Sequence, residues 1–168
     1  MTFTFRPLTD DDLPMLHGWL NEPGIVEWWE GDDVSWEGVV RDYGSQNVEP
    51  IEHWVATLDG RDVGWLDCYA VTDSSEEAEL WLPLGVDPDA AGIDYLIGEP
   101  ADRGRGIGAG MIGAFVREIV FAMHPAWSQA CAAPHRGNVA SWRALEKAGF
   151  RCAGRPASGK LMILDRPR

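Results

Sequence analysis

The chain has 168 residues, 45% of them hydrophobic and nine of them Trp, which is enough to bury a core as one domain spanning residues 1–168. It contains no run of about 18 apolar residues, and its first residues lack the basic and apolar regions of a signal peptide, which predicts a cytoplasmic protein without membrane contact. The net charge of −13 is divided unevenly, with −20 in residues 1–100 and +7 in residues 101–168. This division indicates one cationic and one anionic partner, or an acidic surface that only maintains solubility.

The first 71 residues predict a strand, short helices and a hairpin. Residues 3–8 alternate like a strand, and Thr9 followed by Asp12 is typical of the N-cap and N3 acid of a helix that runs to about residue 20. Pro23 and Gly24 are expected to end this helix. The sequence then predicts one or two short helices within 24–44 and two strands within 53–71, joined by a turn at Asp59-Gly60-Arg61.

The remaining residues alternate strands with helices. Residues 73–92 are acidic and contain Pro and Gly, which predicts a loop with a short strand at AELWL (78–82). Further strands are expected at 92–98, 128–133, 150–154 and 160–165, and helices at 106–123 and 138–149. This order predicts an α/β (α+β) fold in which a mixed sheet carries helices on both faces.

Cys68, Cys131 and Cys152 are odd in number and far apart in the sequence, without a C-x-x-C pair. This pattern argues against a disulfide framework and against a zinc site. All three are therefore expected to be buried thiols.

The stretch RGRGIGAG (103–110) lies between a predicted strand and a predicted helix with apolar residues at every fourth position. A linker needs no such periodicity, and the stretch fits neither the G-x-x-x-x-G-K-[ST] nor the G-x-G-x-x-G motif. Glycines at 104, 106, 108 and 110 allow positive φ angles and close approach of a ligand, and the N-terminus of a helix attracts anions. We therefore expect this segment to hold phosphate groups.

The same residues, Arg103 to Gly108, resemble the R-x-x-G-x-G/A signature of the GCN5-related N-acetyltransferases (GNAT). Within this superfamily the chain resembles the aminoglycoside 6'-N-acetyltransferases over nearly its whole length, through LPMLHGWLNEPGIVEWW (13–29), GIDYLIG (92–98), RGRGIGAG and ALEKAGF (144–150). The resemblance implies a GNAT fold with a mostly antiparallel sheet of about six or seven strands. It also implies acetyl-CoA as cosubstrate, no metal, and direct attack of a 6'-amine on the thioester, which is an antibiotic-resistance activity.

The resemblance further implies which residues form the site. Asp94 would contact the reacting amine and act as the base, although an Asx turn after Gly92 would also explain an aspartate there. The cofactor would be held by Arg103, Gly104, Arg105, Gly106, Ile107, Gly108, Ala109, Gly110 and Asn138, the last of which could serve only as a helix cap. The sugar pocket would be lined by Trp28, Trp29, Asp67, Tyr69, Glu79 and Trp81, although each Trp could instead pack in the core.

Three departures from the family pattern affect the acceptor and the leaving group. Ala133 stands where many of these enzymes have an aspartate, and Leu145 replaces a tyrosine often proposed as the acid for the thiolate. WLPLG (81–85) replaces an acid-rich stretch. Losing the tyrosine is tolerable, because a thiolate with a pKa near 8.5 leaves with little help.

Three functions therefore remain open. The first is acetylation of a cationic small molecule, an aminoglycoside, by a monomer or homodimer without a nucleic-acid partner. The second is acetylation of another amine, such as a siderophore hydroxylysine, whose enzymes typically have His where this chain has Asp94. The third is a non-catalytic coenzyme A-binding or sensor domain. The presence of Asp94 argues against the last two.

Overall fold

A computed structural model of the chain describes residues 1–29, 31–156 and 159–168. Its centre is a sheet of seven strands in the order β1-β2-β3-β4-β5-β7-β6. Every neighbouring pair is antiparallel except β4 and β5, which are parallel. The strands are β1 (Phe3–Pro7), β2 (Glu52–Leu58), β3 (Arg61–Ala70), β4 (Ala90–Ile97), β5 (Gln129–Ala132), β6 (Arg151–Gly154) and β7 (Leu161–Asp165). The prediction of a mixed, mostly antiparallel sheet is confirmed.

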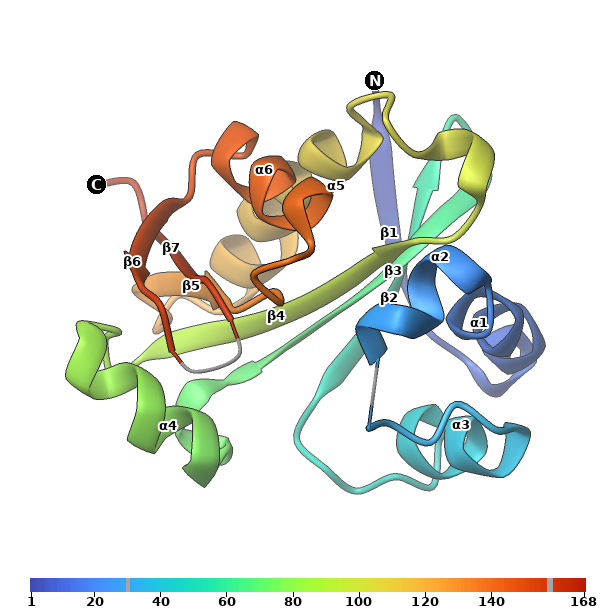
Figure 1. The fold of residues 1–168 in the computed structure, drawn as a ribbon, viewed down its shortest axis with the longest axis horizontal. Coiled ribbons are helices and arrows are strands. Elements are labelled where there is room, and N and C mark those ends of the chain that lie inside the picture. The colour runs from blue at the N-terminus through green and yellow to red at the C-terminus, as the bar shows by residue number, and fades with distance from the viewer. Residues whose placement is uncertain (30, 157–158) are drawn as a thin grey trace.

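Helices cover both faces of this sheet, as the sequence predicted (Figure 1). One face packs on α5 and α6, and its core includes Phe115, Met111 and Leu145. The opposite face carries α1, α2 and α3 at one end, around Leu16 and Trp65, and α4 at the other end. The helices are α1 (Leu13–Leu20), α2 (Pro23–Val26), α3 (Trp36–Tyr43), α4 (Ser75–Trp81), α5 (Ile107–Phe115) and α6 (Val139–Lys147).

Local signals explain the N-terminal elements. The Asp12 carboxylate accepts hydrogen bonds from the Thr9 backbone N–H at 2.9 Å and the Thr9 hydroxyl at 3.1 Å, which begins the turn leading into α1. Asp59 and Gly60 both have positive φ, 53° and 80°, as a two-residue hairpin turn requires, and this turn joins β2 to β3. The expected helix and hairpin are therefore confirmed.

The first helix, α1, ends at Leu20 as expected, and Glu22, the residue before Pro23, is extended (φ −67°, ψ 131°). Pro23 also opens α2, where the Glu22 side chain caps the Gly24 N–H at 3.0 Å. One local prediction is wrong. The expected strand at 78–82 falls mostly within the helix α4. Ser74 caps this helix and two glutamates occupy its first turn, a start signal that outweighs the short apolar run.

Two further expectations need correction. The helix expected over 106–123 is α-helical only to Phe115 and continues as π turns over Val116–Phe121, where four of the six residues are buried. Cys68 and Cys131 are buried thiols as expected, but Cys152 is an exposed one. Cys152 lies on β6, a strand at the edge of the sheet that has a neighbouring strand, β7, on one side only.

The parallel pair β4 and β5 determines where a pocket can form. Their ladder contains only three residue pairs and ends at Gly92 opposite Cys131, whereas β4 continues to Ile97. Beyond this point, among the residues that the structure describes, no strand pairs with this edge of β4. Side chains from both faces of β4 can therefore reach the same space.

Candidate active site

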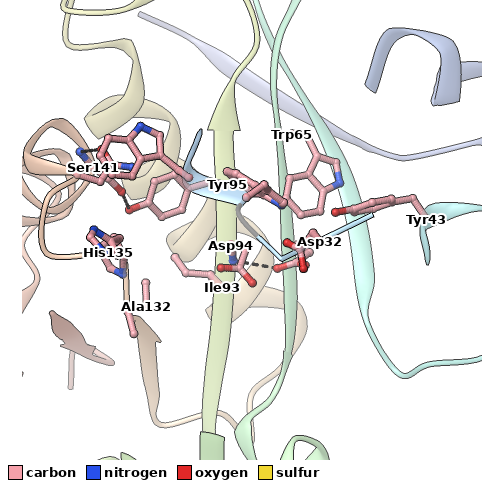
Figure 2. A pocket seen from close by; sticks show the side chains of 15 residues that line it. Asp32, Tyr43, Trp65, Ile93, Asp94, Tyr95, Ala132, His135 and Ser141 are labelled. Atoms are coloured by element: carbon pink, nitrogen blue, oxygen red, sulfur yellow. Dashed lines mark hydrogen bonds between the residues drawn. The ribbon is translucent and has the colours of Figure 1, made fainter. Parts of the chain in front are cut away.

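A cavity of about 270 Å³ lies beside this unpaired edge of β4. Its walls come from the segment around α2, from α3, β3 and β4, from the loop after β5 and from the first turn of α6 (Figure 2). Its lining residues are Trp28, Trp29, Asp32, Tyr43, Trp65, Asp67, Ile93, Asp94, Tyr95, Ala132, Ala133, Pro134, His135, Asn138 and Ser141. Residues far apart in the sequence thus converge on one concave site.

Two aspartates stand next to each other on the floor of the cavity. Asp67 on β3 and Asp94 on β4 are direct partners in the antiparallel register, and one Asp67 carboxylate oxygen accepts the backbone N–H of Asp94 at 2.8 Å. Asp67 is only 5% exposed, whereas the side chain of Asp94 is open to the cavity. Asp94 is therefore the member of the pair that a ligand can reach.

Both carboxyl groups hold their protons more tightly than ordinary aspartates. Burial raises the pKa of Asp67, and the neighbouring Asp94 charge raises it further. Removal from bulk water, together with the charges of Glu77 and Asp32, raises the pKa of Asp94 to about 7. A carboxylate with such a pKa can accept a proton near neutral pH, as a general base must.

Aromatic rings form the side walls. Tyr43 and Trp65 meet edge to face with ring centroids 5.4 Å apart, and Trp29 approaches Trp65 at 6.5 Å. Trp28 lies 5.8 Å from the ring of His135. Rings around a cluster of carboxylates suit a positively charged ligand, because aromatic faces and carboxylates both attract cations.

Tyr95 also lines the cavity, although it points to the opposite face of β4 from Asp94. Its hydroxyl is hydrogen-bonded to the Ser141 hydroxyl on α6 at 2.7 Å (Figure 2). Burial raises the pKa of Tyr95, so this phenol keeps its proton at neutral pH. Sequence reasoning missed Tyr95, because strand alternation separates it from Asp94 and only the divergence of β4 from β5 opens both faces to one cavity.

The glycine segment forms the turn before α5. Gly104 and Gly106 have positive φ angles of 73° and 79°, as expected of glycines there, whereas Gly108 and Gly110 are ordinary helical residues. Gly110 packs closely against Phe3, and a Cβ at this position would lie 2.9 Å from the ring, so the ring would have to shift. The first N–H groups of α5 have no acceptor within the helix, which leaves them available to an anion.

The two arginines of this segment are engaged in ion pairs. Arg103 contacts Glu22 at 2.5 Å and thereby ties the segment to α2. Arg105 lies 3.7 Å from Asp102. The side chain of Asn138 accepts the Ser141 N–H at 3.2 Å, so its role as the cap of α6 is present in the structure, and the same residue borders the cavity.

Three residues expected in the sugar pocket do not line the cavity. Tyr69 is buried and donates its hydroxyl to Glu77 at 2.8 Å. Trp81 is 6% exposed and packs in the core under α4, and Glu79 is exposed on the same helix. Trp28, Trp29 and Asp67 from the same prediction do line it. Leu145, in place of the family tyrosine, is completely buried.

The fold and the site together define an acyltransferase of the GNAT class. The family model for the acetyltransferase (GNAT) domain matches residues 9–156, and the chain belongs to this family. The chain is 32% identical over 157 residues to an aminoglycoside N(6')-acetyltransferase type 1 from Klebsiella pneumoniae and to one from Serratia marcescens. These alignments cover 90% of the chain and 75% of each relative.

Solved structures show the same likeness. Aminoglycoside acetyltransferase AAC(6')-Ib in complex with coenzyme A superposes with a TM-score of 0.84 at 29% identity, covering 98% of this chain and 95% of the other. The complex of that enzyme with coenzyme A and kanamycin gives a TM-score of 0.83 at 29% identity, covering 98% and 95%. Within the part of the chain that the structure describes, no helix is long and apolar enough to span a membrane.

Proposed function

We propose that this chain transfers the acetyl group of acetyl-CoA to the 6'-amine of aminoglycosides, which would inactivate the antibiotic in the cytoplasm. The observation that carries the proposal is the pair of Asp67 and Asp94 inside a cavity with aromatic walls. An aminoglycoside is a polycationic sugar, and four carboxyl groups, those of Asp32, Asp67, Asp94 and nearby Glu77, make this end of the protein attractive to it.

The cosubstrate would bind to residues in the part of the sequence with net positive charge, 101–168. The turn with Gly104 and Gly106 leaves open space where side chains would stand, since a Cβ at either position meets no atom within 4 Å. The pyrophosphate would accept hydrogen bonds from the N–H groups of residues 105–109 at the start of α5, whereas the Gly110 N–H already donates to the Gly106 carbonyl at 3.2 Å. Asn138 at the start of α6 borders the cavity, and its side chain would contact the pantetheine arm.

Four side chains of this chain would assist the reaction. Asp94 pairs with the substrate ammonium, and the carboxylate accepts a proton so that the neutral amine can attack the thioester carbonyl carbon. Trp28 and Trp29 orient the sugar beside it. After the attack the nitrogen still carries one proton too many, which it loses to solvent. As the C–S bond breaks, the hydroxyl of Tyr95, held by Ser141, donates its proton to the sulfur and takes up another from solvent, while Asp94 releases its proton to solvent. The products are the amide, the free thiol of coenzyme A and one proton.

A coenzyme A-release assay tests this proposal with kanamycin-type and gentamicin-type aminoglycosides and with small amines such as hydroxylysine. We expect turnover with the aminoglycosides that is lost in Asp94→Asn and kept in Asp89→Asn, an exposed aspartate next to the start of β4. Turnover of the small amines alone would assign a different acceptor. Binding of coenzyme A without release from any acceptor would indicate a non-catalytic domain.

A further inference from the structure

Three side chains with metal-binding atoms meet outside the cavity, on the α5 side of the sheet. Glu52 on β2, Cys68 on β3 and His124 after the helical segment that follows α5 place one ligand atom each within 4.8 Å of the others. His124 Nε2 lies 3.1 Å from one carboxylate oxygen of Glu52, and the Cys68 Sγ lies 3.8 Å from the other. Nothing in the linear sequence relates these three positions.

Each of the three side chains is held by rigid structure. Glu52 and Cys68 are direct partners in the β2–β3 ladder, so their side chains lie side by side on one face. The ring of His124 stacks on Trp127 with centroids 3.9 Å apart. The carbonyl of His124 accepts the Trp127 N–H at 3.1 Å and an Arg166 N–H at 2.6 Å, which fixes the backbone at this residue. Little ordering is therefore needed before the three groups could share a ligand.

The donor set suits a borderline transition metal. Zn²⁺ binds sulfur at about 2.3 Å and nitrogen or oxygen at about 2.0–2.2 Å, so tetrahedral ligand atoms lie roughly 3.3–3.7 Å apart. Measured from a single oxygen of Glu52, Oε2, the separations are 3.3 Å to His124 Nε2 and 3.8 Å to Cys68 Sγ, and all three ligand atoms lie within 4.8 Å of one another. A divalent ion would also be neutralised there, because a thiolate and a carboxylate supply two negative charges and the imidazole supplies none.

We propose that Glu52, Cys68 and His124 form a three-ligand site for Zn²⁺ or a similar divalent transition metal, with the fourth position open to water. The Glu52 and His124 side chains are 43% and 26% exposed, which gives the ion a path from solvent, while the sulfur is completely buried. On binding, the Cys68 thiol loses its proton to solvent and the sulfur forms the metal–thiolate bond. The ion would link β2 to β3 on the face of the sheet opposite the cavity. Asp67, the residue before Cys68, points to the cavity, so the ion would lie on the other side of the sheet from it.

Cobalt titration provides the test, because Co²⁺ takes similar ligands and a cobalt–thiolate bond gives a charge-transfer absorption band. The full chain is used with Cys152→Ser, which removes the exposed thiol, after dialysis against a chelator. We expect a band that saturates at one cobalt per chain, is displaced by Zn²⁺ and is absent in Cys68→Ala. Cys131→Ala, which removes a buried cysteine outside the cluster, should leave the band unchanged.

Partial loss of ligands gives a second readout. We expect His124→Gln and Glu52→Gln each to weaken cobalt binding by at least about 10- to 100-fold, the loss seen even for residues that only support metal ligands. Both side chains are partly exposed, so these variants should fold even if Cys68→Ala does not. Absence of a thiolate band, or a band of unchanged affinity in His124→Gln, would show that the three residues form only a hydrogen-bonded cluster.

Discussion

Asp94→Asn removes the carboxylate that is open to the cavity and keeps the size of the side chain. The backbone N–H of Asp94, which donates to Asp67 at 2.8 Å, is unchanged by the substitution. We expect kcat/KM for the best aminoglycoside to fall about 10²- to 10⁴-fold, the usual contribution of general acid–base catalysis, as measured by coenzyme A release.

The pH profile gives this prediction a sharper form. Because the base must be deprotonated to act, kcat/KM of the unmodified protein should rise with pH through an apparent pKa of about 7, which belongs to the coupled pair of aspartates. The charge of Asp32 contributes to this raised pKa, so Asp32→Asn should move the acid limb to lower pH. In Asp94→Asn the residual activity should lose this limb.

Stability separates a catalytic effect from a folding effect. A carboxyl group whose pKa is raised in the folded state destabilises the fold once the pH exceeds its unfolded pKa, because the folded protein disfavours the charged form. Removing this group should therefore leave the melting temperature at pH 8 unchanged or higher. Near wild-type turnover by folded Asp94→Asn protein across pH 6–9, or a clearly lowered melting temperature, would refute the assignment of Asp94 as a base with a raised pKa.

Three further changes test the cofactor site, the leaving group and the acidic surface. In Gly108→Asp, calorimetry should show coenzyme A binding weakened about tenfold, or 1.4 kcal/mol, by the new carboxylate near the pyrophosphate. Gly108→Ala should bind coenzyme A normally, since its Cβ meets neighbours only at 3.8 Å. Equal binding by both variants would argue against this site. Tyr95→Phe should lower kcat about tenfold, less than usual for a general acid because a thiolate of pKa about 8.5 leaves readily, and an unchanged kcat would remove its role. The acceptor KM should rise between 0.1 and 1 M salt, as the Debye length falls from about 10 to about 3 Å, whereas a flat KM would make the acidic half a solubility feature.

Much of the fold could be predicted because its signals are local. A capping pair such as Thr9 and Asp12, or a turn such as Asp59-Gly60, acts over two to four residues and depends little on the rest of the chain. The glycine segment before α5 is local in the same way. At α4 two local signals conflict, because the cap at Ser74 favours a helix and the apolar run over 78–82 favours a strand. The segment forms the helix, and Trp81 packs from it into the core.

The cavity itself depended on tertiary structure. Strand alternation correctly places Asp94 and Tyr95 on opposite faces of β4, and this alone would assign them to different sites. They border one cavity because the ladder between β4 and β5 ends at Gly92, and the sequence of neither strand states where that pairing stops. The same distinction explains why Tyr69 and Trp81 lie outside the cavity, since apolar and aromatic residues look alike in a sequence whether they line a pocket or fill a core.

The sequence by itself therefore determined the family, the order of most elements and the candidate base, because each depends on a short motif or on one residue within it. Tertiary structure decided which side chains meet. Asp67 pairs with Asp94 through strand register, Tyr95 reaches Ser141 across the open edge of β4, and Cys68 lies beside Glu52 and His124. Contacts between residues tens of positions apart depend on how the strands are paired and where they diverge, and these are properties of the packed sheet that no single segment encodes.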